Sequence, residues 1–258
     1  DAPEFDADRN DVLERARAAG VARQIVPAIR ATDWPGLHAL CAQHAGLFPA
    51  YGLHPMFLAD HAPDHLDDLA TFIATHRPVA IGECGLDYFR DFSPRHVQRA
   101  AFERQLQIAV DTGKPLFLHQ RDAHEDFVAI MRNFEGRLGP AVVHCFTGTR
   151  RELFECLDRD WYIGITGWLC DERRGQHLRE IVKNIPANRL MVETDAPYLL
   201  PRTLKPMPKD RRNEPMWLPH IVEELARGRG ETPEQVAAAT TATASAFFRL
   251  PAPTPQTA

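Results

Sequence analysis

Residues 79–88 read VAIGECGLDY, an apolar run with Glu83 at its centre. Apolar runs of this length, bounded by turns, indicate strands that are buried on both faces, as in a parallel sheet. Four more runs follow the same pattern. Each ends in a residue that can bind a metal or a phosphate: YGLHP (51–55) at His54, PLFLHQRD (115–122) at His119, AVVHCFTG (141–148) at His144 and RLMVETDAPY (189–198) at Asp195.

Helical patterns separate these runs, for example from Ser93, an expected N-cap, to Gly113, an expected terminator. Strands that alternate with helices indicate βαβ units and a parallel sheet. With VARQIVPAI (21–29) and WYIGITG (161–167) included, seven strands follow an opening helix. We therefore expect an α/β fold, a TIM-type (β/α)8 barrel whose first strand is missing from this chain. An open doubly wound sheet is the alternative, but no GxGxxG turn supports it.

Composition narrows the class of protein further. The chain has 258 residues, of which 44% are apolar, enough for one large core. We expect a single barrel domain over residues 1–250 and a disordered tail over 251–258. No apolar stretch is long enough to span a membrane, and five cysteines without CxxC spacing indicate reduced thiols in a cytoplasmic protein, expected to be a monomer. The net charge of −5 argues against a broad basic face.

The four strand-end residues Glu83, His119, His144 and Asp195 form the expected metal site. In a barrel, the C-terminal ends of the strands share one face, and barrel enzymes have their active sites there. Because strand side chains alternate, Ile81 should share a face with Glu83 and the other ligands should also point inward. A mixed nitrogen and oxygen set suits Zn²⁺ or Mn²⁺, while Mg²⁺ prefers oxygen.

Roles within this site follow from position. Glu83 could bridge two ions, and Asp195 is the natural general base or water-orienting group, so both are expected to be catalytic. His54 lies slightly outside, before Pro55, and is expected to contact phosphate instead of metal. Glu193 is expected to orient a ligand histidine from behind. Cys84 and Cys145 should point away from the site, towards the helices.

A basic loop follows the last of these strands. Residues 197–217 hold five prolines, and long irregular loops in compact domains are usually functional. Residues 201–212 carry a local charge of +4 on an acidic protein, which favours an anionic substrate. The residues expected to hold phosphates are Arg202, Lys205, Arg211 and Arg212. An aromatic residue near the mouth, Tyr88, Phe89 or Trp168, could stack on a base, although packing is the commoner role.

Together these motifs resemble those of the TatD-related deoxyribonucleases, metal-dependent members of the amidohydrolase-like barrels. The resemblance extends over essentially the whole chain and rests on IGECGLDY, FLHQRDAH, HCFTGT, ETDAPYLLPR and RRNEP. It implies a cytoplasmic nuclease that removes nucleotides from single-stranded DNA, or RNA, in the 3′→5′ direction, with one or two divalent ions, commonly Mg²⁺. Glu83, His119, His144 and Asp195 match the family's metal and catalytic residues, and His54 matches its GxHP histidine. The role of the RNEP segment (212–215) does not follow from the sequence.

One feature of the family is outside this sequence. Most members of the wider family carry an HxH pair on the first strand, and two fewer histidines would favour a more weakly held Mg²⁺. Two other functions remain open. One is an amidohydrolase that acts on a small amide or ester with the same metal chemistry. The other is a non-catalytic, partner-binding barrel, whose signature would be the loss of a ligand, and all four ligand positions are intact.

Overall fold

Seven parallel strands form one curled sheet in the structure, a computed structural model that describes residues 1–62 and 64–252. The strands lie in sequence order from β1 to β7, each hydrogen-bonded to the next. This confirms the predicted parallel α/β architecture and the seven strands. Most of the expected tail, residues 253–258, lies outside the described residues. The strands are β1 (Gln24–Ala28), β2 (Leu47–Tyr51), β3 (Ala80–Asp87), β4 (Leu116–Arg121), β5 (Ala141–Val143), β6 (Tyr162–Ile165) and β7 (Leu190–Val192).

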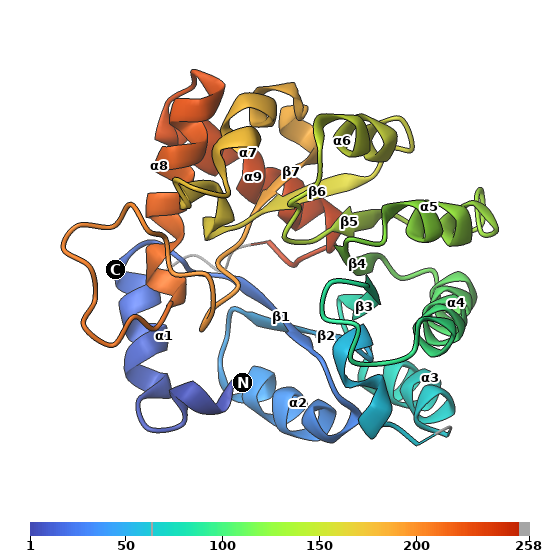
Figure 1. The fold of residues 1–258 in the computed structure, drawn as a ribbon. Helices are drawn as coiled ribbons and strands as arrows, with labels where there is room; N and C mark the ends of the chain where they lie inside the picture. The colour runs from blue at the N-terminus through green and yellow to red at the C-terminus, as the bar shows by residue number, and fades with distance from the viewer. Residues whose placement is uncertain (63, 253–258) are drawn as a thin grey trace.

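Helices follow the strands in alternation and lie on the outer side of the curled sheet (Figure 1). Two further helices, α8 and α9, come after β7, and a helix precedes β1. Their bounds are α1 (Arg9–Ala18), α2 (Trp34–Gln43), α3 (His65–His76), α4 (Arg95–Thr112), α5 (His124–Arg132), α6 (Arg150–Leu157), α7 (Gln176–Ile181), α8 (Leu218–Arg229) and α9 (Pro233–Phe247). No helix among the described residues is long and apolar enough to cross a membrane.

Apolar residues form two clusters, one on each side of the sheet. The larger cluster fills the space between the strands and the surrounding helices. The smaller one fills the inside of the curled sheet with Ala80, Phe117, Val142 and Met191, and the end of α9 packs against it. Such inward-facing layers are the usual filling of a barrel interior. The next inward residues towards the C-terminal ends of the strands are the polar ones, so the inner cluster is the floor of the site.

The alternation of side chains breaks within β3, and this corrects one prediction. Ile81 faces the outer cluster, whereas Glu83 points inward, so the two do not share a face. The pairing of β3 with β4 shifts register between Ile81 and Cys84, which places one extra residue in β3. Gly82 lies at this shift with a φ of +145°, and a Cβ there would lie 2.1 Å from the carbonyl oxygen of Phe117. Glycine is therefore required for Glu83 to face the interior.

The start of α4 also differs from the prediction. Pro94 occupies the N-cap position of this helix, whereas Ser93 had been expected there. The Ser93 hydroxyl instead accepts a hydrogen bond from the backbone N–H of Ala59. At the other end, Gly113 terminates α4 with a φ of +64°, as expected. The predicted N-cap residue is therefore wrong, but the helix and its end at Gly113 are confirmed.

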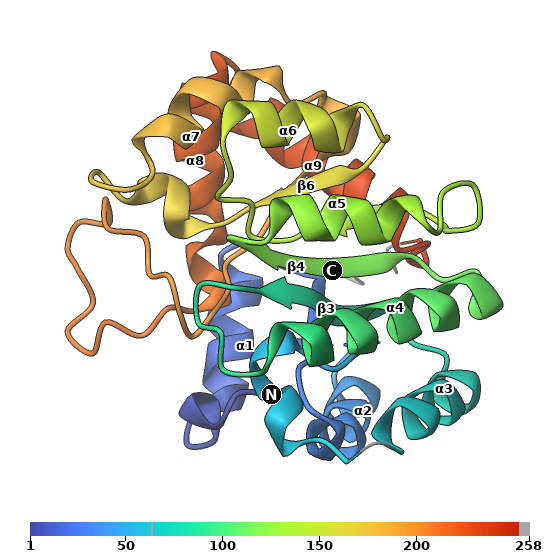
Figure 2. The same ribbon diagram turned by 45° about the vertical axis from the view of Figure 1, so that its right-hand side comes forward.

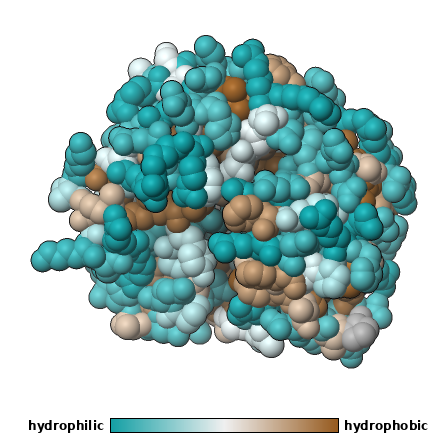
Figure 3. Space-filling view, in the orientation of Figure 1, coloured by the Kyte–Doolittle hydropathy of each residue, from teal (hydrophilic) through white to brown (hydrophobic). Residues whose placement is uncertain are grey.

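The loop after β7 projects on the side towards which the arrowheads of β3 and β4 point (Figure 2). This places residues 197–214 at the C-terminal face of the sheet, as the sequence predicted. The surface is largely hydrophilic, and hydrophobic residues lie beside the hollow near the centre of the face in Figure 3.

Candidate metal centre

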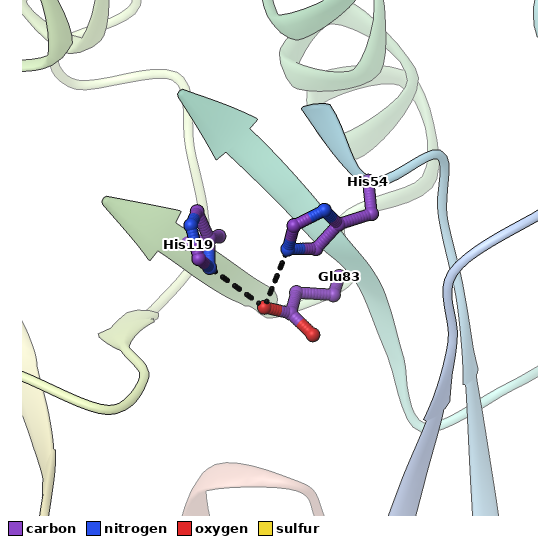
Figure 4. Close-up of side chains that lie close together, drawn as sticks. All are labelled: His54, Glu83 and His119. Carbon is purple, nitrogen blue, oxygen red and sulfur yellow. Dashed lines mark hydrogen bonds and ion pairs between the residues drawn. The ribbon is translucent and has the colours of Figure 1, made fainter. Parts of the chain in front are cut away.

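One carboxylate oxygen, Oε1 of Glu83, is the centre of the candidate site. It lies 2.9 Å from Nδ1 of His119, 3.1 Å from Nε2 of His54 and 3.6 Å from Nε2 of His144. The ring of His54, from the turn after β2, and the ring of His119, from β4, both point to this oxygen (Figure 4). The side chains of Glu83, His54 and His144 are nearly completely buried. The strand ends therefore bring together residues that are far apart in the sequence.

The outer nitrogens of His119 and His144 are each held by a second carboxylate. Nε2 of His119 lies 3.0 Å from Oδ2 of Asp87, and Nδ1 of His144 lies 2.8 Å from Oε2 of Glu193. A carboxylate behind a histidine fixes the ring and makes its inner nitrogen a better metal ligand. Both inner nitrogens face Glu83. The expected role of Glu193 agrees with this geometry, whereas the sequence analysis assigned no role to Asp87.

His54 is arranged differently, although it lies just as close to Glu83. Its Nδ1 accepts a hydrogen bond from the backbone N–H of Met56. Burial lowers the pKa of His54, so the ring is neutral and its one hydrogen is on Nε2. Nε2–H then donates to Glu83, and a nitrogen that carries a hydrogen cannot bind a metal. The structure places His54 inside the cluster, closer than the sequence suggested, but as a hydrogen-bond donor.

The charges in the site balance one another. Burial alone would raise the pKa of Glu83, but the surrounding histidines outweigh it and hold the pKa well below its usual value. Burial alone would lower the pKa of His119 and His144, but contacts with Asp87, Glu83 and Glu193 raise both. Without a metal, these contacts favour a proton on the nitrogen of each ring that faces Glu83. A cation at this point would replace those protons, as expected for a metal site.

Asp195 lies at the open side of the cluster. Its Oδ1 is 3.5 Å from Nε2 of His144, and its side chain is 31% exposed, more than that of any other carboxylate or histidine in the cluster.

The orientation of Cys145 differs from the prediction. Its thiol faces the site and not the helices, because the residue has a φ of +45°. Burial raises the pKa of this thiol to about 12, and its Sγ lies 3.3 Å from the hydroxyl oxygen of Thr166.

These residues fit a divalent ion. Among the described residues, two groups of potential ligands lie close enough together to hold a metal: His54, Glu83 and His119, and His144, Cys145 and Asp195. Two of these six differ from the rest: Nε2 of His54 carries the hydrogen of the ring, because Nδ1 accepts from Met56, and the thiol of Cys145 contacts the hydroxyl of Thr166. Two imidazole nitrogens and two carboxylates remain, the same four residues that the sequence predicted. Mixed sets of this kind hold Zn²⁺ or Mn²⁺, and the carboxylates also suit Mg²⁺.

Two buried glutamines of α4 hold the chain on either side of the site. The side chain of Gln105 bonds to both the N–H and the C=O of Leu53, the residue before His54, at 2.8 and 3.1 Å. Gln98 does the same for Asp87, at 2.8 and 3.1 Å. Neither glutamine is among the residues predicted from the sequence. Their spacing of seven residues, two helical turns on the apolar face of α4, was the signal that could have found them.

The RNEP segment fixes the loop that carries Asp195. The side-chain amide of Asn213 donates to the carbonyl oxygens of Thr194, at 2.8 Å, and Tyr198, at 2.6 Å. Glu214 accepts bonds from Arg15 of α1 at 2.9 Å and from Arg212 at 2.8 Å. The segment therefore joins the last strand end to the first helix, a role that the sequence had left open.

The four basic residues expected to hold phosphate differ in their surroundings. Arg212 bonds to Asp8 and Glu214, so two carboxylates of the protein itself already neutralise its charge. Nε of Arg202 lies 3.2 Å from Oδ2 of Asp171, although 51% of the arginine side chain is exposed. Lys205 and Arg211 are exposed on the loop. The structure thus assigns Arg212 a structural contact and leaves the other three at the surface.

The sequence matches the family described as TatD related DNase over residues 1–249. This protein belongs to that family. Curated TatD relatives include the "3′-5′ ssDNA/RNA exonuclease TatD" of Citrobacter rodentium, which is 46% identical over 96% of this chain and 94% of its own length. The protein of the same name from Salmonella typhimurium is 45% identical, over 96% of this chain and 95% of its own.

Solved structures agree with the TatD assignment. The TatD homologue YJJV of Escherichia coli K12 superposes with a TM-score of 0.89 at 28% identity, covering 97% of this chain and 95% of its own. The phosphotriesterase homology protein of Escherichia coli superposes with a TM-score of 0.65 at 15% identity, over 92% of this chain and 88% of its own. At that identity the second likeness concerns the fold alone.

Proposed function

We propose that this protein is a metal-dependent exonuclease that removes nucleotides from the 3′ end of single-stranded DNA or RNA. The observation that carries the proposal is the convergence of His119 and His144 on Glu83 at the C-terminal face of the sheet, with Asp195 3.5 Å from His144. The names of the TatD relatives supply the substrate and the direction.

Glu83, His119, His144 and Asp195 would hold one or two divalent ions. When bound, such an ion polarises a phosphate and lowers the pKa of water. The rings of His119 and His144 are kept in place by Asp87 and Glu193. We propose Mg²⁺ as the ion, with Mn²⁺ and Zn²⁺ as alternatives that the same donors accept.

The remaining residues act on the substrate. Asp195 is exposed enough to meet a water molecule and accept its proton. Nε2–H of His54 donates to Glu83 in this structure, and we propose that it would donate to a phosphate oxygen instead when Glu83 holds an ion. Arg202, Lys205 and Arg211 are proposed to meet phosphates further along the strand. A cytoplasmic location and a monomeric state stay predictions.

A direct test uses single-stranded DNA and RNA labelled at the 5′ end, with Mg²⁺, Mn²⁺ or Zn²⁺ and an EDTA control. We expect a ladder that shortens from the 3′ end and is lost with EDTA. The isosteric variant Glu83→Gln should lose about 100-fold or more of the rate, because it removes a ligand charge. Glu103→Gln, an exposed site on α4, is the matched control and should cleave normally.

The outcome separates the candidate reactions. Intact nucleic acid under every metal would overturn the nuclease proposal and direct attention to small amides and esters, which the same metal chemistry can hydrolyse. Cleavage that survives in Glu83→Gln would show that the cluster is not the active centre.

A further inference from the structure

Four planar groups are stacked alternately at the rim of the metal centre. The guanidinium of Arg121 lies 5.0 Å from the ring centre of Phe89 and 4.6 Å from that of Trp168. The guanidinium of Arg174 lies 4.3 Å from the same Trp168 ring. Phe89 follows β3, Arg121 ends β4, and Trp168 belongs to a 3₁₀ helix, η4 (Gly167–Cys170), after β6. The loops of three strands thus meet at one arginine.

Arg121 differs from the neighbouring arginines because no carboxylate of the described residues lies within hydrogen-bonding distance of its guanidinium. Arg174 and Arg202 both approach Asp171, at 3.0 and 3.2 Å. The hydrogen bond of Arg121 goes to a neutral hydroxyl, that of Thr147, and the nearest carboxylate, Asp122, is 3.7 Å away and 62% exposed. Only 24% of the Arg121 side chain is exposed. A largely buried cation is normally paired, so an anion from outside the protein is the missing partner.

Its place on the strand links Arg121 to the reaction. Arg121 comes two residues after His119, so both side chains leave the same face of β4, about 6.6 Å apart along the strand. His119 faces the metal centre, and Arg121 occupies the next position towards the mouth. An anion bound by Arg121 would therefore lie beside the group bound at Glu83.

Exposed aromatic rings gather at the same end of the molecule. Among the described residues, four large hydrophobic side chains are exposed, and three of them lie in loops after β3 and β7: Phe89, Phe92 and Tyr198. Phe89 is 57% exposed beside the guanidinium of Arg121. A cation next to an exposed ring is the arrangement by which single-stranded nucleic acids are held, through phosphate contact and base stacking.

We propose that Phe89, Arg121 and Trp168 form a nucleotide subsite at the rim of the metal centre. Arg121 binds a phosphate of the strand, Phe89 stacks on a base, and Trp168 holds the guanidinium in place. The subsite rests on the proposed nuclease function and identifies where the strand lies. It recognises any base, because every base has a face on which an aromatic ring can stack.

Binding without cleavage tests the subsite. We would titrate the full chain, in EDTA, into a 5′-fluorescein-labelled oligodeoxythymidine and follow its anisotropy from about 50 to 200 mM salt. Arg121→Gln should bind about tenfold more weakly, and its salt slope should fall by about 0.7. Arg137→Gln is the matched control, since Arg137 also covers a ring, Phe134, but lies in the loop before β5, at the opposite end of the strands. It should bind like the wild type.

A second variant keeps the test valid if Arg121→Gln folds poorly. Phe89→Ala removes an exposed ring and should weaken binding about five- to 150-fold. With an oligonucleotide whose 3′-terminal nucleotides are abasic, the wild type should bind more weakly and Phe89→Ala should show no further loss. If the wild type degrades DNA while Phe89→Ala and Arg121→Gln bind it normally, the subsite is wrong and the nuclease stands. If the wild type neither binds nor degrades DNA, both proposals fall.

Discussion

Three histidines surround one carboxylate of this protein, yet their outer nitrogens give them different roles. Asp87 and Glu193 accept hydrogen bonds from His119 and His144, which leaves the inner nitrogens of those rings for a metal. A backbone N–H donates to His54, which puts its hydrogen on the inner nitrogen. By distance alone, all three histidines would be candidate ligands. The hydrogen-bond partner on the outer side of each ring singles out His119 and His144 as the candidates.

This difference predicts that His54→Ala and His144→Ala fail in different ways. His54→Ala should keep its affinity for Mn²⁺ within about threefold, but cleave about 100-fold more slowly, because a donor to the substrate is lost. His144→Ala should lose about 100-fold or more in Mn²⁺ affinity. Isothermal titration with Mn²⁺ and single-turnover cleavage measure the two effects. Equal losses of metal affinity in both variants would make His54 a ligand.

At this scale the sequence predicted which residues form the candidate site but not how all of their neighbours are oriented. Glu83, His119, His144 and Asp195 were found because each follows an apolar run, a local signal. The outward turn of Ile81 was missed because one extra residue enters the pairing of β3 with β4. Asp87 was missed because its role depends on a neighbouring strand. Such features arise from tertiary contacts, which strand alternation does not encode.

Among the elements, α4 contributes most directly to the site. Its side chains Gln98 and Gln105 each form two hydrogen bonds with the backbone of one residue, Asp87 and Leu53 respectively. A buried backbone N–H and C=O without partners would each cost free energy. The helix therefore provides hydrogen-bond partners for the backbone where β3 ends and where the turn to His54 begins. The end of α4 at Gly113 was predictable from the sequence, but these bonds were not.

Replacing Gln105 by leucine tests whether α4 positions His54 or only covers the strands. Gln105→Leu keeps most of the volume but leaves the N–H and C=O of Leu53 unpaired, which costs about 1–3 kcal/mol for each group. We expect a melting temperature lower by several degrees and a reduced kcat, because His54 follows Leu53. Gln107→Leu, whose side chain bonds only to Asp111 on the same helix, is the control. Wild-type kcat in Gln105→Leu would show that α4 covers the strands without positioning His54.

Across the whole molecule, a group of four charged residues joins the beginning of the chain to its last third. Arg15 of α1 bonds to Asp8 and Glu214, and Arg212 bonds to the same two carboxylates. β1 and β7 are the two edge strands of the sheet. Because α1 precedes β1 and Glu214 follows β7, these contacts tie the two edges together. In Figure 1, α1 lies below the start of α8, and it contacts the short 3₁₀ helix η7 (Pro215–Trp217) that precedes α8. Nothing in the local sequence pairs residues so far apart.

The pH dependence of stability tests this group. Hydrogen bonds from Arg212, and then from Arg15, lower the pKa of Asp8 to about 2. A carboxyl whose pKa is lower in the folded state stabilises the fold fully above its unfolded pKa of about 3.9, and this contribution is lost as pH falls through the folded value. The melting temperature of Asp8→Asn should therefore lie below that of the wild type at pH 7, and the gap should close between about pH 4 and pH 2. Asp68→Asn, on α3, is the control for general acid effects. A gap that is absent at pH 7, or that persists unchanged to pH 2, would show that Asp8 does not hold the two edges together.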